Sequence, residues 1–249
     1  MQTGVSASAS WRWTFGHSPP SERESPHAVV SSLPVLGVVE AYTCLDLELL
    51  PKLVEIVGDR GPVETGELQT ALTAAVQAQQ ADIERQGLDR CLAAGIVSLL
   101  VPEADHVTIV HVGNCAVFKR TRDSLTRLTP LGTVLGEAIE SGRITMAEAR
   151  EHPSPMILSQ FIGGRSGEPT LWHVARVQLR PSEQLVVTTS HVAWALTTSP
   201  TLQALDLPPN SNDCVQRLIK LGDPARIEGS ALILERPTNQ PENLLRATG

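Results

Sequence analysis

Four strand-like segments follow one another between residues 94 and 128, with only short polar connections between them. They cover residues 94–101, 106–112, 116–121 and 124–128. Connections this short join antiparallel strands, because a parallel pair needs a crossover of about a dozen residues or more. The region therefore predicts antiparallel hairpins and argues against a parallel, doubly wound sheet.

Outside this hairpin region the sequence contains both helix-like and strand-like segments. A helix is expected over 65–87, where Leu68, Leu72 and Val76 recur at helical spacing after Thr65 as N-cap. The other expected helices cover 45–57, 133–141, 145–152, 192–196 and 213–221, and the other expected strands cover 11–16, 27–31, 34–40, 171–179, 184–189 and 230–235. Strands grouped apart from helices predict an α+β layered fold, with helices covering two mainly antiparallel sheets.

The length of 249 residues is that of one large domain with a single core. We expect this domain over 11–236, with loose tails at 1–10 and 237–249, where small, polar and proline residues are frequent. A hydrophobic share of 41% and a charged share of 19% are typical of a globular protein rather than a disordered one.

Charge, hydropathy and cysteine usage restrict the partners and the compartment. The net charge of −7 argues against nucleic acid or an anionic membrane as partner, because either would require a basic face. No apolar run approaches the roughly 20 residues that span a bilayer, and the first ten residues lack the pattern of a signal peptide. The cysteines are widely spaced, at Cys44, Cys91, Cys115 and Cys214. This spacing favours free thiols in a reducing cytoplasm over structural disulfides.

Three stretches resemble motifs of the PPM (type 2C) metal-dependent serine/threonine protein phosphatases. The first, His111-Val-Gly-Asn-Cys-Ala-Val-Phe118 with Leu125-Thr-Arg-Leu-Thr129, is similar to His-Val-Gly-Asp-Ser-Arg-x-Tyr followed by Leu-x-x-Leu-Thr. Residues 142–153 resemble the bacterial flap segment Gly-x-Ile-Thr-x-Glu-Glu-Ala-x-x-His-Pro. Residues 179–192 resemble Leu-x-Pro-Gly-Asp-x-Leu-Leu-Leu-x-Ser-Asp-Gly. The resemblance runs from about residue 11 to residue 235.

This resemblance implies a four-layer αββα sandwich of two sheets, with a metal site in the cleft between them and a flap at about 132–163. It also implies two Mg²⁺ or Mn²⁺ ions held by Asp carboxylates. Such ions lower the pKa of a bridging water and orient it for attack on the phosphoryl group. Both ions require oxygen ligands in nearly octahedral geometry.

The sequence departs from the family at each Asp position that can be aligned. The family's Val-x-Asp-Gly corresponds to Val38-Val39-Glu40-Ala41, so the bridging Asp is Glu40 and the Gly is Ala41. The extra methylene moves the carboxylate by roughly 1.5 Å, beyond the ~0.5 Å tolerance of a working site. Asn114 replaces the Asp of Gly-Asp-Ser-Arg, and His191 replaces the Asp of Ser-Asp-Gly.

Two further family positions are also altered. The late Asp-Asn-x-Thr motif falls at 227–230, which puts Ile227 or Glu228 at its Asp. The phosphate-contacting Arg near the N-terminus has no counterpart in register, although Arg23 lies nearby in the sequence. These changes together indicate a lost metal site, and we expect no cofactor; Mg²⁺ or Mn²⁺ would bind only if the site still functions.

Three sets of residues have types that could carry chemistry. Glu40, His191 and Glu228 could form a rebuilt single-ion site, for example for Zn²⁺, but a disused cleft of mutually bonded polar residues is favoured. Cys115 lacks the phosphate cradle and nearby Arg of a cysteine nucleophile. The pattern around His106 and His111 is typical of core or edge histidines.

The sequence therefore predicts a cytoplasmic, bacterial-type pseudophosphatase that acts through protein contacts in phospho-signalling. The flap, with Gly142, Ile144, Glu148 and His152, is either plain structure or a partner-binding surface. The expected partner is a serine/threonine kinase, a phosphoprotein or an active phosphatase. The alternatives are an atypical metal-dependent phosphatase with altered ligands, and a metal or small-ligand sensor that uses the same cleft.

Overall fold

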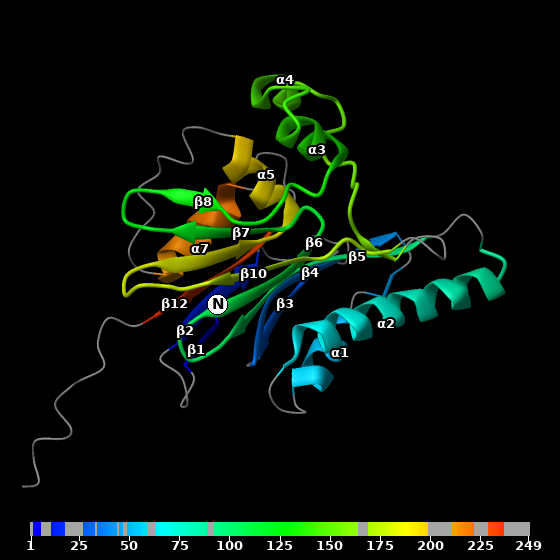
Figure 1. The fold of residues 1–249 in the computed structure, drawn as a ribbon, viewed down its shortest axis with the longest axis horizontal. Coiled ribbons are helices and arrows are strands. Elements are labelled where there is room, and N and C mark those ends of the chain that lie inside the picture. Colours follow the sequence, from blue (N-terminus) through cyan, green and yellow to red (C-terminus); the bar gives the residue numbers. More distant parts are fainter. Residues whose placement is uncertain are drawn as a thin grey trace, which may run out of the picture.

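The structure of the chain is a computed structural model. It describes residues 2–5, 11–17, 27–32, 34–43, 45–46, 49–58, 63–88, 92–163, 169–198, 211–221 and 229–236. Two sheets form its centre (Figure 1). Within these residues every strand pairing is antiparallel, as expected. The first two and the last two of the four segments between 94 and 128 form hairpins, but the connection at 113–115 passes from one sheet to the other, so the hairpin expected there is wrong.

The two sheets are built from segments far apart in the sequence. In spatial order, the first sheet contains β1 (Gln2–Val5), β2 (Arg12–His17), β12 (Ser230–Glu235), β11 (Gln184–Thr188), β7 (Ala116–Arg120) and β8 (Leu125–Arg127). The second contains β10 (His173–Val177), β6 (Val107–Val112), β5 (Ala93–Pro102), β4 (Val35–Thr43) and β3 (His27–Ser32), with β9 (Ile162–Gly163) pairing with β5.

Helices cover the outer face of each sheet (Figure 1). The helices α1 (Leu49–Gly58) and α2 (Thr65–Arg85) pack on the second sheet, and α5 (Ser190–Thr198) and α7 (Ser211–Leu221) pack on the first. Two short helices, α3 (Val134–Glu140) and α4 (Met146–Arg150), form the flap. The expected αββα sandwich is therefore confirmed.

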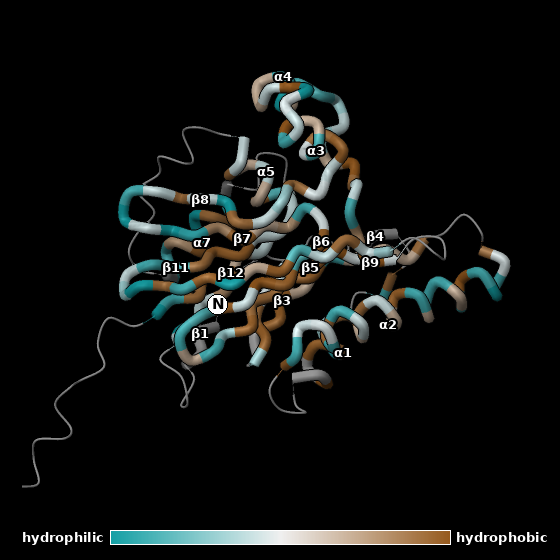
Figure 2. Tube along the Cα trace, viewed as in Figure 1, coloured by the Kyte–Doolittle hydropathy of each residue, from teal (hydrophilic) through white to brown (hydrophobic). Residues whose placement is uncertain are grey.

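Aliphatic side chains fill the space between the sheets. Leu36, Val38 and Ile96 from the second sheet pack with Leu185 and Leu232 from the first. Figure 2 shows the hydrophobic residues concentrated along these strands. Every residue of β6 is buried, because the strand lies between the other sheet on one face and the helices on the other.

Three expectations about local structure need correction. Residues 2–5 form strand β1 on the edge of β2, so the expected loose tail at 1–10 is wrong for these residues, whose backbone extends the ladder. Helix α1 begins at Leu49 rather than at 45. Thr65 is the first residue of α2, and Glu64 occupies the N-cap without a side-chain hydrogen bond. The tail at 237–249 lies outside the described residues.

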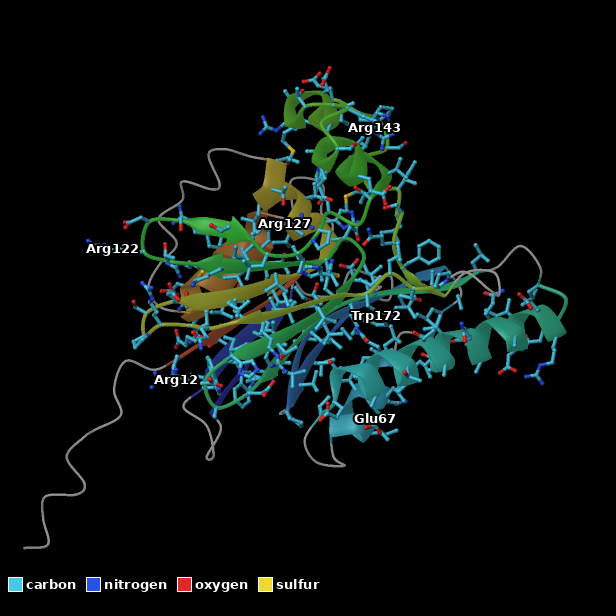
Figure 3. All side chains as sticks on the ribbon, in the orientation of Figure 1. Arg12, Glu67, Arg122, Arg127, Arg143 and Trp172 are labelled. Atoms are coloured by element: carbon cyan, nitrogen blue, oxygen red, sulfur yellow. The ribbon has the colours of Figure 1, made fainter. Side chains whose placement is uncertain are left out.

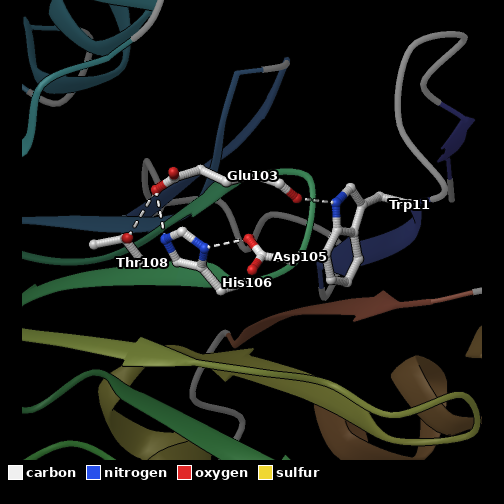
Figure 4. Close-up of polar contacts among 5 residues, drawn as sticks. All are labelled: Trp11, Glu103, Asp105, His106 and Thr108. Carbon is white, nitrogen blue, oxygen red and sulfur yellow. Dashed lines mark hydrogen bonds and ion pairs between the residues drawn. The ribbon is translucent and has the colours of Figure 1, made fainter.

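A polar network fixes the turn between β5 and β6 to the start of β2 (Figure 4). Trp11 donates its indole N–H to the carbonyl oxygen of Glu103 at 2.8 Å. His106 lies between two carboxylates, with Nδ1 2.8 Å from Asp105 Oδ1 and Nε2 3.0 Å from Glu103 Oε1. The hydrogen bond with His106 lowers the pKa of Asp105. His106 is therefore an edge histidine with a structural role, as expected.

Cys115 and Cys214 are buried free thiols, which confirms the expectation for these two cysteines; Cys44 and Cys91 lie outside the described residues. Among the helices that the structure describes, none is both long and apolar enough to cross a membrane.

Candidate functional site

The candidate site centres on Glu40, which lies in β4 and faces the first sheet. Leu36 and Val38 on the same strand pack between the sheets, and the alternation of side chains along a strand puts Glu40 on that face. Glu40 is 4% exposed. A carboxylate at this depth needs hydrogen-bond donors, because an unpaired buried charge is very costly.

The donors come from the opposite side of the sandwich. Ser190, the first residue of α5, donates its backbone N–H to Glu40 Oε1 at 2.5 Å and its hydroxyl to Oε2 at 2.8 Å. The Cys115 thiol donates to Oε1 at 3.3 Å. Because the N-terminus of a helix carries partial positive charge, it favours an anion at this position. Glu40 thus caps α5 and joins the two sheets.

Cys115 is fully buried beside this carboxylate. Burial raises the pKa of its thiol well above the ordinary value, and the neighbouring charge of Glu40 raises it further. The reactive form of a cysteine is the thiolate. Cys115 is therefore a neutral hydrogen-bond donor in this site. This agrees with the sequence, which argued against Cys115 as a nucleophile.

His191 follows Ser190 in the first turn of α5 and is half-buried. Burial lowers the pKa of His191, while the charge of Glu40 opposes that shift. The structure thus brings His191 within electrostatic reach of Glu40, as expected from the sequence. Ala41 lies next to Glu40 but belongs to the core under α1 and α2. Glu228 lies outside the described residues.

Asn114 occupies the turn after β6 and is 4% exposed. Its side-chain amide has no hydrogen-bond partner among the described residues. The turn requires glycine at 113, where φ is 102° and a Cβ would approach Ile96 Cγ2 to 2.3 Å. The motif-like sequence therefore forms a tight turn at Gly113, and the Asn114 amide makes no hydrogen bond within the described part of the chain.

These side chains do not fit two divalent ions. Two such ions need several carboxylates, whereas Glu40 supplies one whose two oxygens already accept hydrogen bonds. In the described part of the chain, no three His, Cys, Asp or Glu residues converge in a way that could hold a metal ion.

Arg127, labelled in Figure 3, lies at the base of the flap. Its role could not be predicted from the sequence. Its guanidinium donates to the carbonyl oxygens of Thr129 and Pro130 at 2.8 and 2.7 Å and to Thr197 Oγ1 at 2.9 Å. Burial lowers its pKa to about 10. Arg127 therefore connects the chain entering the flap with α5, the helix that Glu40 caps.

The four flap residues named from the sequence have local structural roles or surface positions. Gly142 has a φ of 71° after α3. Glu148 completes the expected capping box with Thr145, accepting its backbone N–H at 2.6 Å, and this bond lowers the pKa of Glu148. Ile144 is half-buried, and exposed His152 accepts the N–H of Ser154 at 3.1 Å.

Protein stability should fall on acidification because of His111, which is fully buried and bonded to Ser98 Oγ at 2.8 Å. Burial, then the charges of Arg127 and His173, lower its pKa from 6.5 to about 3. Since the unfolded chain binds this proton first, stability is complete above pH 6.5 and declines as the pH falls toward 3. The loss should be on the order of 4 kcal/mol.

Urea titrations from pH 7 to pH 4 test this expectation. His111→Gln should flatten the decline, and His152→Gln at the exposed flap position should leave it as it is. Equal slopes for His111→Gln and the natural chain would show that other groups cause the decline.

Comparisons with known proteins agree with this fold. No protein-family model matches the sequence. The serine/threonine protein phosphatase PstP of two Mycobacterium tuberculosis strains is 25% identical over 164 residues, which is 63% of this chain. The chain covers 30% of the length of these curated relatives.

Solved structures match over nearly the whole chain. The M. tuberculosis PstP/Ppp structure has a TM-score of 0.74 at 16% identity, covering 91% of this chain and 99% of that one. The PPM phosphatase MsPP of Mycobacterium smegmatis has a TM-score of 0.66 at 17% identity, covering 91% and 97%. Another PstP structure, of the catalytic domain with two manganese ions, has a TM-score of 0.70 at 15% identity, covering 90% and 97%.

The fold is that of the metal-dependent serine/threonine phosphatases. The structural matches show this fold, and the sequence similarity to PstP agrees with it.

Proposed function

We propose that this chain is a pseudophosphatase, a catalytically inactive PPM domain that acts as a regulatory or scaffolding protein-binding module in phospho-signalling. The observation that carries the proposal is the bonding of Glu40. The carboxylate at the position of the family's bridging ligand accepts two hydrogen bonds from Ser190 and one from Cys115. Protein donors thus already use both carboxylate oxygens, which two metal ions would otherwise share.

The chemistry of the family explains why this bonding matters. Hydrolysis of a phosphoester by two ions requires a bridging water whose pKa both ions lower. Asn114 and His191 are neutral ligands at best, and they supply none of the negative charge that holds Mg²⁺ or Mn²⁺. These side chains therefore favour a protein-binding role without phosphatase turnover.

The alternative is an atypical metal-dependent phosphoprotein phosphatase, or a metal sensor, that uses Glu40 and His191. The charge of Glu40, which opposes the lowering of the His191 pKa by burial, favours this alternative. Glu228 would have to be the third ligand. Because Zn²⁺ accepts His and carboxylate ligands together, it is the ion that this set suits best.

For partners we propose a cytoplasmic serine/threonine kinase, a phosphoprotein or an active phosphatase. PstP, the relative found by sequence, is a serine/threonine protein phosphatase. The flap offers one candidate contact surface, since Val134 and Ile157 are 50% and 56% exposed and their backbones are joined by a hydrogen bond.

Steady-state hydrolysis of an aryl phosphate and of a phosphothreonine peptide tests the proposal. With Mn²⁺, Mg²⁺ or Zn²⁺ at millimolar concentration, the natural chain should show no turnover above background. Glu40→Ala should give the same trace. Turnover that depends on metal and disappears in Glu40→Ala would instead establish the atypical phosphatase.

A further inference from the structure

The edge of the second sheet at β10 combines an open strand with a cavity. In the described part of the chain β10 pairs with β6 alone, so its other edge carries no strand. An open edge presents unpaired backbone N–H and C=O groups that can pair with another strand.

A cavity of about 270 Å³ lies where the chain returns from the flap and leads into β10. It is lined by Ser159, Gln160, Phe161, Gly163, Pro169 and Leu171. Leu171 is 65% exposed, and the buried hydroxyl of Ser159 has no hydrogen-bond partner among the described residues. The cavity thus offers apolar walls from Phe161, Pro169 and Leu171.

Side chains along β10 continue this surface. Val174 is 45% exposed, on the face where its neighbour Val110 is covered by the helices. Trp172 packs against the core beneath those helices and is half-buried at the same edge (Figure 3). The helices therefore leave part of the outer face of β10 uncovered.

The charge of this edge differs from that of the whole protein. The segment 169–180 contains Arg176 and Arg180 and no acidic residue, whereas the chain as a whole has a net charge of −7. Both arginines are exposed, and no ion pair joins Arg176 to a described carboxylate. A partner with acidic residues would complement this edge and be repelled by much of the remaining surface.

We propose that β10 and the adjacent cavity bind an extended, acidic segment of a partner protein as an added strand. Backbone hydrogen bonds to β10 would hold the segment, and an apolar side chain would enter the cavity beside Leu171. An acidic residue would pair with Arg176. This inference rests on the proposed function, because it names a surface through which the proposed protein-binding module would hold its partner. It does not depend on whether the metal site is intact.

Selection from a phage-displayed random twelve-residue library on the full chain tests the proposal. Selected peptides should contain acidic and large apolar residues, and they are then synthesised for titration by fluorescence anisotropy. Leu171→Asp should weaken binding at least tenfold, and Arg176→Ala should weaken it severalfold. Two matched controls at other exposed apolar side chains, Leu88→Asp after α2 and Ile56→Asp on α1, should leave the affinity unchanged.

N-methylation of the peptide backbone identifies strand addition itself. In a β-ladder alternate N–H groups face the partner strand, so methylation at every second position should abolish binding, and methylation between them should be tolerated. A flat methylation profile, loss of binding in Leu88→Asp or Ile56→Asp, or a library without binders would each overturn the proposal. So would a dimer in sedimentation that Leu171→Asp dissociates, because β10 would then pair with a second copy. None of these readouts measures hydrolysis, so failure here leaves the test of catalytic inactivity unaffected.

Discussion

Glu40→Ala should lower the free energy of unfolding by about 3 kcal/mol, because it removes the acceptor of two charge-assisted hydrogen bonds. The backbone N–H and hydroxyl of Ser190 lose their described acceptor in a buried position, as does the Cys115 thiol. For a domain of this size the melting temperature should fall by roughly 6–12 °C. Denaturant titration without metal, together with thermal melts, measures both quantities.

The sign of this change separates the two accounts of the cleft. In a site of clustered carboxylates awaiting metal, removal of one would relieve like-charge repulsion and stabilise the metal-free protein. Asn114→Ala is the matched control, since Asn114 is equally buried at 4% exposure, yet its amide has no partner among the described residues. It should cost less than about 1 kcal/mol. An unchanged or raised stability of Glu40→Ala would show that Glu40 does not cap α5.

The fold was predictable because its strongest signals are local. The hairpins β5–β6 and β7–β8 and the stripe in α2 were predicted correctly, since each depends on residues close in sequence. The short connection from β6 to β7 was wrongly predicted as a hairpin, because it passes from the second sheet to the first. Strand β1 was missed, because the small and polar residues at 2–5 gain strand structure only by pairing with β2. The motif that residues 179–192 resemble has a glycine where this chain has Ser182. In the structure Ser182 has a φ of 75°, a conformation that favours glycine.

Of the candidate site, the proximity of Glu40 and His191 was predictable, but the hydrogen bonds around Glu40 were not. The sequence indicated that Glu40 and His191 share the cleft. It did not indicate that Ser190, 150 residues away, supplies two donors to Glu40, because that contact depends on how the two sheets face each other. The role of Arg127 was missed for the same reason, since its acceptors on the flap base and α5 come together only in the folded chain.

Restoring the family ligands should make the protein less stable alone and responsive to Mn²⁺. The repaired chain carries Glu40→Asp, Ala41→Gly, Asn114→Asp, His191→Asp, Val192→Gly and Glu228→Asp. Without metal it should lose several kcal/mol, on the order of 4, through carboxylate repulsion, the shortened cap at position 40 and the cavity left by buried Val192. A control with Asn in place of each introduced Asp should lose less, because it carries no clustered charge.

The most direct test is the melting temperature of the natural and the repaired chain as a function of Mn²⁺ concentration. Ions that bind the folded state alone stabilise it by about 2.7 kcal/mol at a hundredfold excess over Kd, which is roughly 5–10 °C for a domain of this size. We expect that rise for the repaired chain and a change within about 1 °C for the natural chain and the Asn control. The opposite result, with the natural chain stabilised by several degrees and the repaired chain indifferent, would contradict the pseudophosphatase account and establish a working metal site at Glu40 and His191.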